Sequence, residues 1–120
     1  MRLEGHVEKG WGSEFIFATT DKYCGKLLKF NQGAEFSMHF HAEKDETWLV
    51  LSGHFKVEWI DTKNATVNQK ILVVGDAWHN PPLVPHRLSC LSADGGTLVE
   101  VSTPDSVEDN HRILPGDSQK

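Results

Sequence analysis

Three potential metal ligands, His39, His41 and Glu46, lie within eight residues of the sequence. In a β-strand the side chains at positions i and i+2 share a face, so an extended backbone would aim both imidazoles in the same direction. Glu46 follows four mostly polar residues, 42–45, which predict a connection to a second strand. His86, just after a proline-rich turn, is the best candidate for a further ligand. Three imidazoles and one carboxylate suit zinc or a first-row transition ion, with open positions for water or substrate.

Each of these residues alone has a simpler interpretation. A lone His-x-His pair is most often two surface or hydrogen-bonded histidines, and Glu46 alone is most often a solvated carboxylate. The joint pattern is more specific, because Gly33 and Gly53 bracket it and a second segment supplies the missing ligand. The sequence therefore predicts one divalent metal ion, whose identity among zinc, manganese, iron, nickel and cobalt stays open.

The two segments resemble the two motifs of the cupin superfamily. The first motif, Gly-x5-His-x-His-x4-Glu-x6-Gly, is matched without a gap from Gly33 to Gly53. The second, Gly-x5-Pro-x-Gly-x2-His-x3-Asn, is matched at its first glycine, proline and histidine, whereas Leu83 stands at the second glycine and Cys90 at the asparagine. The resemblance implies the cupin jelly roll, or double-stranded β-helix, with the metal inside a small barrel and substrate entering at one mouth.

The pattern of the whole chain also favours an all-β barrel or sandwich. Short apolar segments recur every eight to twelve residues with turn signals between them, and no stretch has a convincing helical period. We expect a single domain of 120 residues, with a barrel core at about 13–103 and a mostly irregular tail at 104–120 that leaves the barrel. Strands are expected at 14–20, 23–30, 35–41, 46–52, 54–61, 69–74, 86–91 and 97–101.

The strand expected at 35–41 raises a question of burial. Its alternation places both histidines on one face and Phe36, Met38 and Phe40 on the other. If the histidine face lines a cavity, the apolar face needs a cover, because an exposed apolar patch is a liability. An added strand, the N-terminal arm or a second subunit would serve, and a homodimer is the favoured choice.

Composition limits the partners. The chain has 17 acidic and 12 basic residues, a net charge of −5 and a sequence pI of about 5.7, which argues against nucleic acid or an anionic membrane as a general partner. No apolar stretch has signal-peptide or membrane-spanning length, so a cytoplasmic location is expected. Cys24 and Cys90 lack a Cys-x-x-Cys spacing, and two free thiols are the favoured interpretation, although only the fold decides whether they meet.

Further residues resemble the cupin-type (type II) mannose-6-phosphate isomerases. In that group two acidic residues are followed by two positions and an arginine, a spacing that Glu108, Asp109 and Arg112 reproduce. One departure is His39, where the isomerases commonly carry glutamine. The other matching pieces are Trp11-Gly12, Lys26, Ser37-Met38, Glu46-x-Trp48, Gly75-Asp76 and Val99-Glu100-Val101.

The resemblance implies a small-molecule substrate, a sugar phosphate, and an aldose–ketose isomerisation. That reaction moves a proton between C1 and C2, so it needs an acid–base group, a stabilised oxyanion and cations for the phosphate. The base stays unknown, with Glu35, Glu46 and Glu100 as weak candidates. The candidate phosphate ligands, each with a solvated surface charge as its simpler interpretation, are Lys26, Arg87 and Arg112.

Two other classes of function remain open. An iron-dependent dioxygenase would use the same four ligands, leave coordination sites for dioxygen and substrate, and need fewer cations in its cavity. A sugar- or metabolite-binding module would keep the pocket and lack a positioned base, so it would bind its ligand without turnover.

Overall fold

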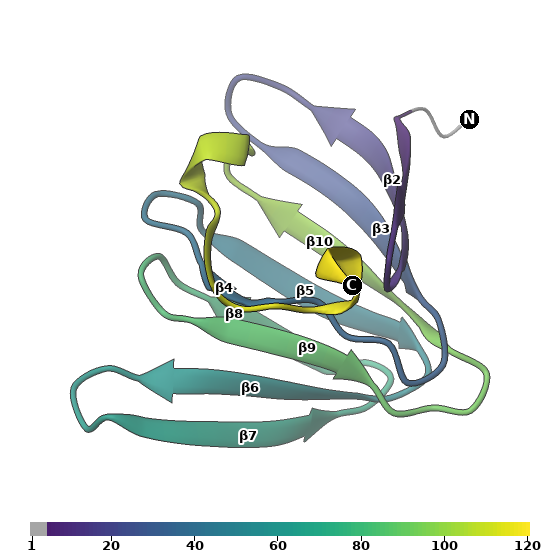
Figure 1. The fold of residues 1–120 in the computed structure, drawn as a ribbon. Coiled ribbons are helices and arrows are strands. Elements are labelled where there is room, and N and C mark those ends of the chain that lie inside the picture. The colour runs from purple at the N-terminus through teal and green to yellow at the C-terminus, as the bar shows by residue number, and fades with distance from the viewer. Residues whose placement is uncertain (1–4) are drawn as a thin grey trace.

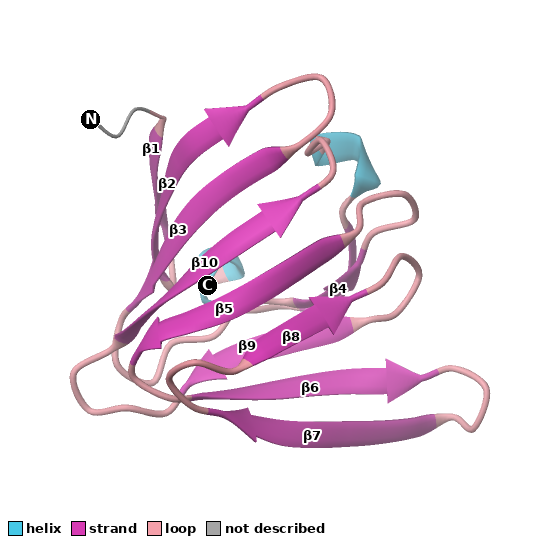
Figure 2. Cartoon of the chain, turned by 180° about the vertical axis from the view of Figure 1, so that it is seen from behind, coloured by secondary structure: helices cyan, strands magenta, loops and turns pink. Residues whose placement is uncertain are grey.

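The computed structural model describes residues 5–120, apart from the side chain of Val107, and its regular secondary structure is almost entirely β-strand. The strands form two antiparallel sheets that face each other, as Figure 1 and Figure 2 show from opposite sides. The expected all-β barrel is therefore confirmed. Helical structure within residues 5–120 consists of two short 3-10 turns, η1 (Val107–Asp109) and η2 (Asp117–Gln119), and no helix there could span a membrane.

One sheet has six strands and the other has five. The order of the six-stranded sheet is β1 (His6–Lys9), β2 (Gly12–Thr19), β3 (Cys24–Phe30), β10 (Gly96–Ser102), β5 (Glu46–Ser52) and β8 (Ala77–Asn80). The order of the five-stranded sheet is β11 (His111–Leu114), β4 (Met38–Phe40), β9 (His86–Cys90), β6 (Phe55–Asp61) and β7 (Thr66–Leu72). The sequence did not reveal β1, β8 and β11, which are short and mostly exposed.

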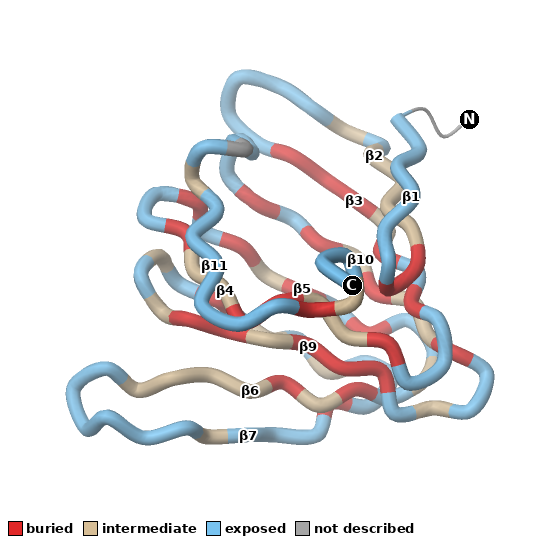
Figure 3. Tube along the Cα trace, in the orientation of Figure 1, coloured by how far each residue is buried: buried red, intermediate tan, exposed pale blue. Residues whose placement is uncertain are grey.

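The core lies between the sheets, where the buried stretches of β3, β5, β9 and β10 meet (Figure 3). Strand β6 shows the expected alternation, with Phe55 and Val57 fully buried and the charged residues between them only partly buried. Trp11, which lies between Gly10 and Gly12, belongs to this core. Its side chain is buried and stacks on Phe30, with ring centroids 4.4 Å apart. The core also contains Cys90, which is a free thiol, as is the buried Cys24.

The C-terminal segment does not leave the barrel as expected. Strand β11 pairs with β4, and beyond it the Asp117 amide donates to the carbonyl of Glu35 at 3.0 Å. The return donation, from the Glu35 amide to the Asp117 carboxylate, spans 2.9 Å. The residues of β11 are all exposed, so no alternation of apolar and polar side chains marked them as a strand.

The tail also answers the question of what covers the apolar face of β4. Phe40 stacks on His111 of β11 with ring centroids 4.9 Å apart, so an added strand of the same chain supplies the cover. Phe36 does not share that face, because the regular strand begins only at Met38. The Phe36 side chain points inward, and its ring centroid lies 5.7 Å from that of Trp48. The argument for a dimer partner at this face therefore fails, and the homodimer itself stays a prediction.

Candidate metal centre

The two sheets bring the histidines of both motifs together. His39 lies on β4 directly opposite His86, the first residue of β9, and His41 follows β4. One ring nitrogen from each of these three histidines lies within 4.8 Å of the others. Glu46 opens β5 in the other sheet, and its Oε1 lies 2.9 Å from His86 Nε2. The structure thus gathers all four of the expected ligands at one place.

The three imidazoles are oriented in the same way, by a hydrogen bond from Nδ1–H to a backbone carbonyl. His39 donates to Ser37 at 2.7 Å, His41 to Asp109 at 2.7 Å and His86 to Val84 at 3.0 Å. Because a carbonyl can only accept, each of these bonds assigns the proton of the neutral ring to Nδ1. The Nε2 atoms then carry free lone pairs, which is the tautomer that a metal-bound histidine needs.

The surroundings lower the pKa of two of these rings, and a ring nitrogen of the third has no hydrogen-bond partner. Burial, helped by the charge of His86, lowers the pKa of His39 to about 3. Burial likewise lowers the pKa of His41. His86 Nε2 is buried and makes no hydrogen bond, although it faces a carboxylate oxygen of Glu46. A ring nitrogen and a carboxylate oxygen that lie 2.9 Å apart repel each other unless a proton or a metal ion lies between or beside them. The donor set therefore fits a divalent cation.

A ring of ion pairs lies beside the histidines. We call its members the charged side of the site, in contrast to the histidine side formed by His39, His41 and His86. The charged side consists of Glu14, Lys26, Lys44, Glu46, Glu100 and Asp105. Its centre is the buried ammonium of Lys44, which lies 3.2 Å from Glu46 Oε2, 3.2 Å from Glu100 Oε2 and 3.0 Å from Asp105 Oδ1.

Lys26 extends this ring. Its Nζ pairs with Asp105 and lies 3.7 Å from Glu14 Oε1. Burial alone would lower the pKa of Lys26, but the charges of Glu100 and Glu14 raise it overall. Lys26 is therefore a protonated lysine whose charge is already neutralised. A cation held this way has little attraction left for a phosphate group.

The carboxylates of the ring have opposite pKa shifts. Burial alone would raise the pKa of Glu46, but the close approach of His86 and the charge of Lys44 lower it. Burial and the neighbouring charge of Glu46 raise the pKa of Glu100. Glu100 also accepts a hydrogen bond from the indole Nε1–H of Trp48 at 3.2 Å. Glu46 therefore ionises at a lower pH than Glu100, which holds its proton more readily.

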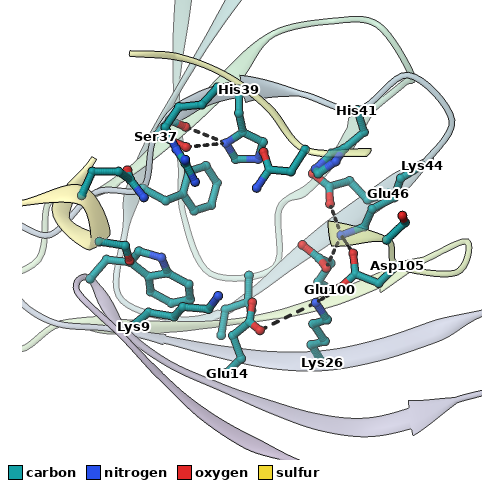
Figure 4. A pocket seen from close by; sticks show the side chains of 18 residues that line it. Lys9, Glu14, Lys26, Ser37, His39, His41, Lys44, Glu46, Glu100 and Asp105 are labelled. Carbon is teal, nitrogen blue, oxygen red and sulfur yellow. Dashed lines mark hydrogen bonds and ion pairs between the residues drawn. The ribbon is translucent and has the colours of Figure 1, made fainter. Parts of the chain in front are cut away.

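His39, His41 and the charged side face a cavity of about 340 Å³, a volume that suits a small ligand, whereas His86 lies buried behind its wall. In Figure 4, His39 and His41 point into it from one side, and Glu14, Lys26 and Glu100 point into it from the other. Residues of the C-terminal tail complete the wall, so the tail is part of the site. The remaining lining residues are Lys9, Trp11, Leu28, Phe36, Ser37, Lys44, Glu46, Asp105, Ser106, Asn110, Arg112, Ser118 and Gln119.

The structure divides the other expected site residues into two groups. Lys26, Arg112 and Glu100 line the cavity. Glu35 and Arg87 lie outside it, because alternation along β9 turns His86 inward and Arg87 outward. There the Arg87 guanidinium donates to the carbonyl of Pro115 at 3.0 Å and lies 3.7 Å from Glu35. Neither residue can contact a ligand held in the cavity.

Sequence reasoning missed four residues that shape the site. Lys44 had been included in the polar connection 42–45, where only its position two residues before Glu46 could have drawn attention. Lys9 and Asp105 lie in segments that looked irregular, and no local signal marks them. Asp109 had a signal, because it belongs to the acidic pair before Arg112, but its structural role was not apparent.

The turn before His86 explains the departure from the second motif. Leu83, at the position of the motif glycine, has a φ of +71°, the left-handed conformation that glycine adopts most easily. Its amide donates to the carbonyl of His41 at 2.7 Å and so ties the second motif to the first. The backbone geometry of the motif is therefore retained despite the leucine.

Comparison with known protein families and relatives agrees with this geometry. A family model for the cupin domain matches residues 26–102. A curated relative, mannose-1-phosphate guanylyltransferase 2 of Escherichia coli O157:H7, is 33% identical over 86 residues. The match covers 68% of this chain but only 18% of the longer relative.

Solved structures with the same fold come from several kinds of protein. KdgF from Halomonas sp. is 24% identical with a TM-score of 0.69, covering 80% of this chain and 81% of that one. CapF from Staphylococcus aureus is 16% identical with a TM-score of 0.84, covering 95% and 32%. Oxalate decarboxylase from Bacillus subtilis is 19% identical with a TM-score of 0.77, covering 92% and 30%. At these identities the likeness establishes the fold alone.

Proposed function

The chain belongs to the cupin family, and from that premise we propose that it is a metal-dependent enzyme that isomerises a sugar phosphate. The observation that carries the proposal is the convergence of three histidine Nε2 atoms, each left with a free lone pair, beside a cavity with carboxylates on its other side. The name of the Escherichia coli relative contains a sugar phosphate, mannose 1-phosphate, which supports the same class of substrate.

Four residues of this chain would hold the metal ion. His39, His41 and His86 would provide three imidazole nitrogens, and Glu46 would be the fourth ligand, for which Lys44 competes. A divalent ion supplies a Lewis acid that polarises the carbonyl and the neighbouring hydroxyl of an aldose or ketose.

Arg112 and Lys9 would bind the phosphate group. Both line the cavity, and within residues 5–120 neither is paired with a carboxylate. Arginine adds a bidentate fork that matches phosphate, whereas lysine contributes a point charge. Two available cations at the wall favour a sugar phosphate over an uncharged substrate.

Glu100 would carry the proton. It lines the cavity from the side opposite the histidines, and its carboxyl is buried. In the isomerisation a carboxylate takes the proton from C2 of the aldose and returns it to C1 of the enediol, while the proton of the C2 hydroxyl passes to the C1 oxygen, so the reaction gains and loses no atom.

The first test is metal content by mass spectrometry on protein purified without an affinity tag, beside the His41→Ala variant. We expect about one divalent metal ion per wild-type chain and its loss in the variant. A wild-type chain that holds no metal even after reconstitution contradicts the proposal and leaves a binding barrel.

The second test follows mannose 6-phosphate and fructose 6-phosphate by NMR in deuterated water with the metal-loaded protein. An enediol route incorporates deuterium at C2, and the Glu100→Gln variant should keep its metal and lose the exchange. Binding without exchange identifies a binding module, and iron-dependent oxygen uptake identifies a dioxygenase. Either of these results contradicts the isomerase.

A further inference from the structure

Asp109, in the turn η1 of the C-terminal tail, contacts the connection between two expected metal ligands. Its carboxylate accepts hydrogen bonds from three successive backbone amides, those of Ala42 at 2.7 Å, Glu43 at 3.0 Å and Lys44 at 3.0 Å. These amides belong to the loop that leads from His41 to Glu46. Successive amides around an anion form a nest, and each bond to an ionised carboxylate is stronger than a neutral one.

The pKa of Asp109 agrees with this arrangement. Burial alone would raise the pKa of its carboxyl, but the three amide donors lower it overall. The carboxylate is therefore ionised at neutral pH and holds the loop in one conformation. The same loop carries Lys44, whose ammonium is the centre of the charged side.

The backbone of Asp109 makes a second contact, this time with a metal ligand. Its carbonyl accepts the Nδ1–H of His41 at 2.7 Å, across 68 residues of sequence. The carbonyls that orient His39 and His86 belong to residues only two positions away in their own segments. His41 is thus the histidine of the three whose orientation depends on the tail.

We propose that Asp109 is a positioning residue that holds the His41 ring in its metal-binding tautomer by anchoring the tail to the loop after His41. The carboxylate and the carbonyl act together, because the three amide bonds keep the carbonyl within reach of the imidazole. This proposal rests on the proposed metal site. It also explains why an acid stands at this position of the tail.

The tautomer of His41 can be measured by nitrogen-15 NMR of the side chain in the metal-free protein. We expect a single Nδ1–H tautomer in the wild type and a mixture in the Asp109→Ala variant, because the carbonyl moves away with the tail. The matched control is Asp117→Ala, which removes a tail carboxylate that accepts from the Glu35 amide and has no contact with His41. The control should leave the His41 tautomer unchanged.

Cobalt(II) titration followed by visible absorption measures the consequence for the metal site. Losing an outer partner of a ligand typically weakens metal binding by about 10- to 100-fold, and we expect a loss in this range for Asp109→Ala but not for Asp117→Ala. The Asp109→Asn variant, which keeps one carbonyl oxygen, should recover part of the affinity. It also replaces the alanine variant in every comparison if the latter does not fold.

Two results overturn the proposal: an unchanged His41 tautomer in the Asp109 variants, or equal losses of cobalt affinity in the Asp109 and Asp117 variants. Equal losses would mean that the tail stabilises the fold in general. A wild-type protein that does not bind cobalt overturns the proposed metal site instead. The NMR comparison uses metal-free protein and still decides the role of Asp109.

Discussion

The histidine side and the charged side of the cavity are both buried and polar, but they satisfy their hydrogen-bonding groups differently. On the histidine side each Nδ1–H goes to a backbone carbonyl, which leaves the three Nε2 lone pairs available. On the charged side the lysines and carboxylates satisfy one another, with Lys44 contacting three carboxylates at once. The first side is therefore prepared for a ligand from outside, whereas the second is largely complete in itself.

This difference determines which charges a ligand can use. The charged side contains two lysines and four carboxylates, so it has a negative excess that a divalent cation on the histidine side would offset. Its two lysines are neutralised, whereas Lys9 and Arg112 line the cavity wall without a carboxylate partner among residues 5–120. A charge that lines a cavity is thus not always a charge that a substrate can bind.

The largest expected effect comes from the centre of the charged side. In the Lys44→Met variant the buried carboxylates of Glu46 and Glu100 lose their counter-charge, so the free energy of unfolding of the metal-free protein should fall by about 3–5 kcal/mol. Urea unfolding followed by tryptophan fluorescence measures the change. Added Mn²⁺ should raise the Tm of this variant more than that of the wild type, because a bound cation replaces part of the lost charge.

The matched control for Lys44→Met is Lys56→Met. Lys56 lies 3.8 Å from Glu58 in a half-exposed ion pair on β6, and such pairs contribute at most about 1 kcal/mol. Equal losses of stability in the two variants would break the comparison, because the charged side would then behave like any surface ion pair.

The next effect separates neutralised cations from available ones. Lys26→Met should lower the free energy of unfolding by about 2 kcal/mol, less than Lys44→Met because Asp105 keeps its contact with Lys44. Its affinity for mannose 6-phosphate should stay close to that of the wild type. Arg112→Gln should do the reverse. It should weaken the binding of mannose 6-phosphate by about tenfold, which corresponds to one charge-assisted hydrogen bond, and should cost little stability.

Calorimetric titration of mannose 6-phosphate and thermal unfolding, both applied to both variants, check this pair of predictions. If Lys26→Met no longer bound mannose 6-phosphate but was as stable as the wild type, the ion pairs of Lys26 would have to open for the substrate. The charged side would then be a binding surface, contrary to the comparison.

A smaller effect depends on pH. Burial alone would raise the pKa of Asp105, but the charge of Lys44 and the hydrogen bond from Lys26 lower it to about 2. A carboxyl with a lowered pKa contributes stability above its unfolded value near 3.8 and loses that contribution as the pH falls toward 2. Asp105→Asn should therefore cost less than about 1 kcal/mol at pH 6, since the group is half-exposed, and nothing near pH 2. Urea unfolding of both proteins at a series of pH values measures the difference, and a constant difference across the range would contradict it.

The histidine side could be predicted from the sequence because its determinants are local. His39 and His41 lie two positions apart on one short segment, and the motif spacing identified Glu46 and His86 as their partners. The strands other than β1, β8 and β11 were predictable for the same reason, since alternation is visible within a few residues. The motif could be recognised even at Leu83, where the turn keeps the left-handed backbone conformation although leucine replaces the glycine.

The charged side and the tail could not be predicted, because their determinants lie far apart in the sequence. Asp105 meets Lys26 across 79 residues, and nothing near either of them indicates the pair. Strand β11 has no apolar alternation, since its side chains are all exposed and it adds to an existing sheet edge through backbone hydrogen bonds. Phe36 was assigned to the wrong face because the backbone before Met38 is not a regular strand.

The smallest expected effect concerns a carboxylate that belongs to neither side. Glu35 accepts a hydrogen bond from Ser89 at 3.0 Å and lies outside the cavity, so Glu35→Gln should change the free energy of unfolding by no more than about 0.5 kcal/mol. Metal content and deuterium exchange at C2 should equal those of the wild type, whereas Glu100→Gln should lose the exchange. Suppose instead that Glu35→Gln kept its metal and lost the exchange. The substrate would then have to reach the outer surface of the five-stranded sheet, where Arg87 also lies, and the division of the cavity into two sides would no longer describe the active site.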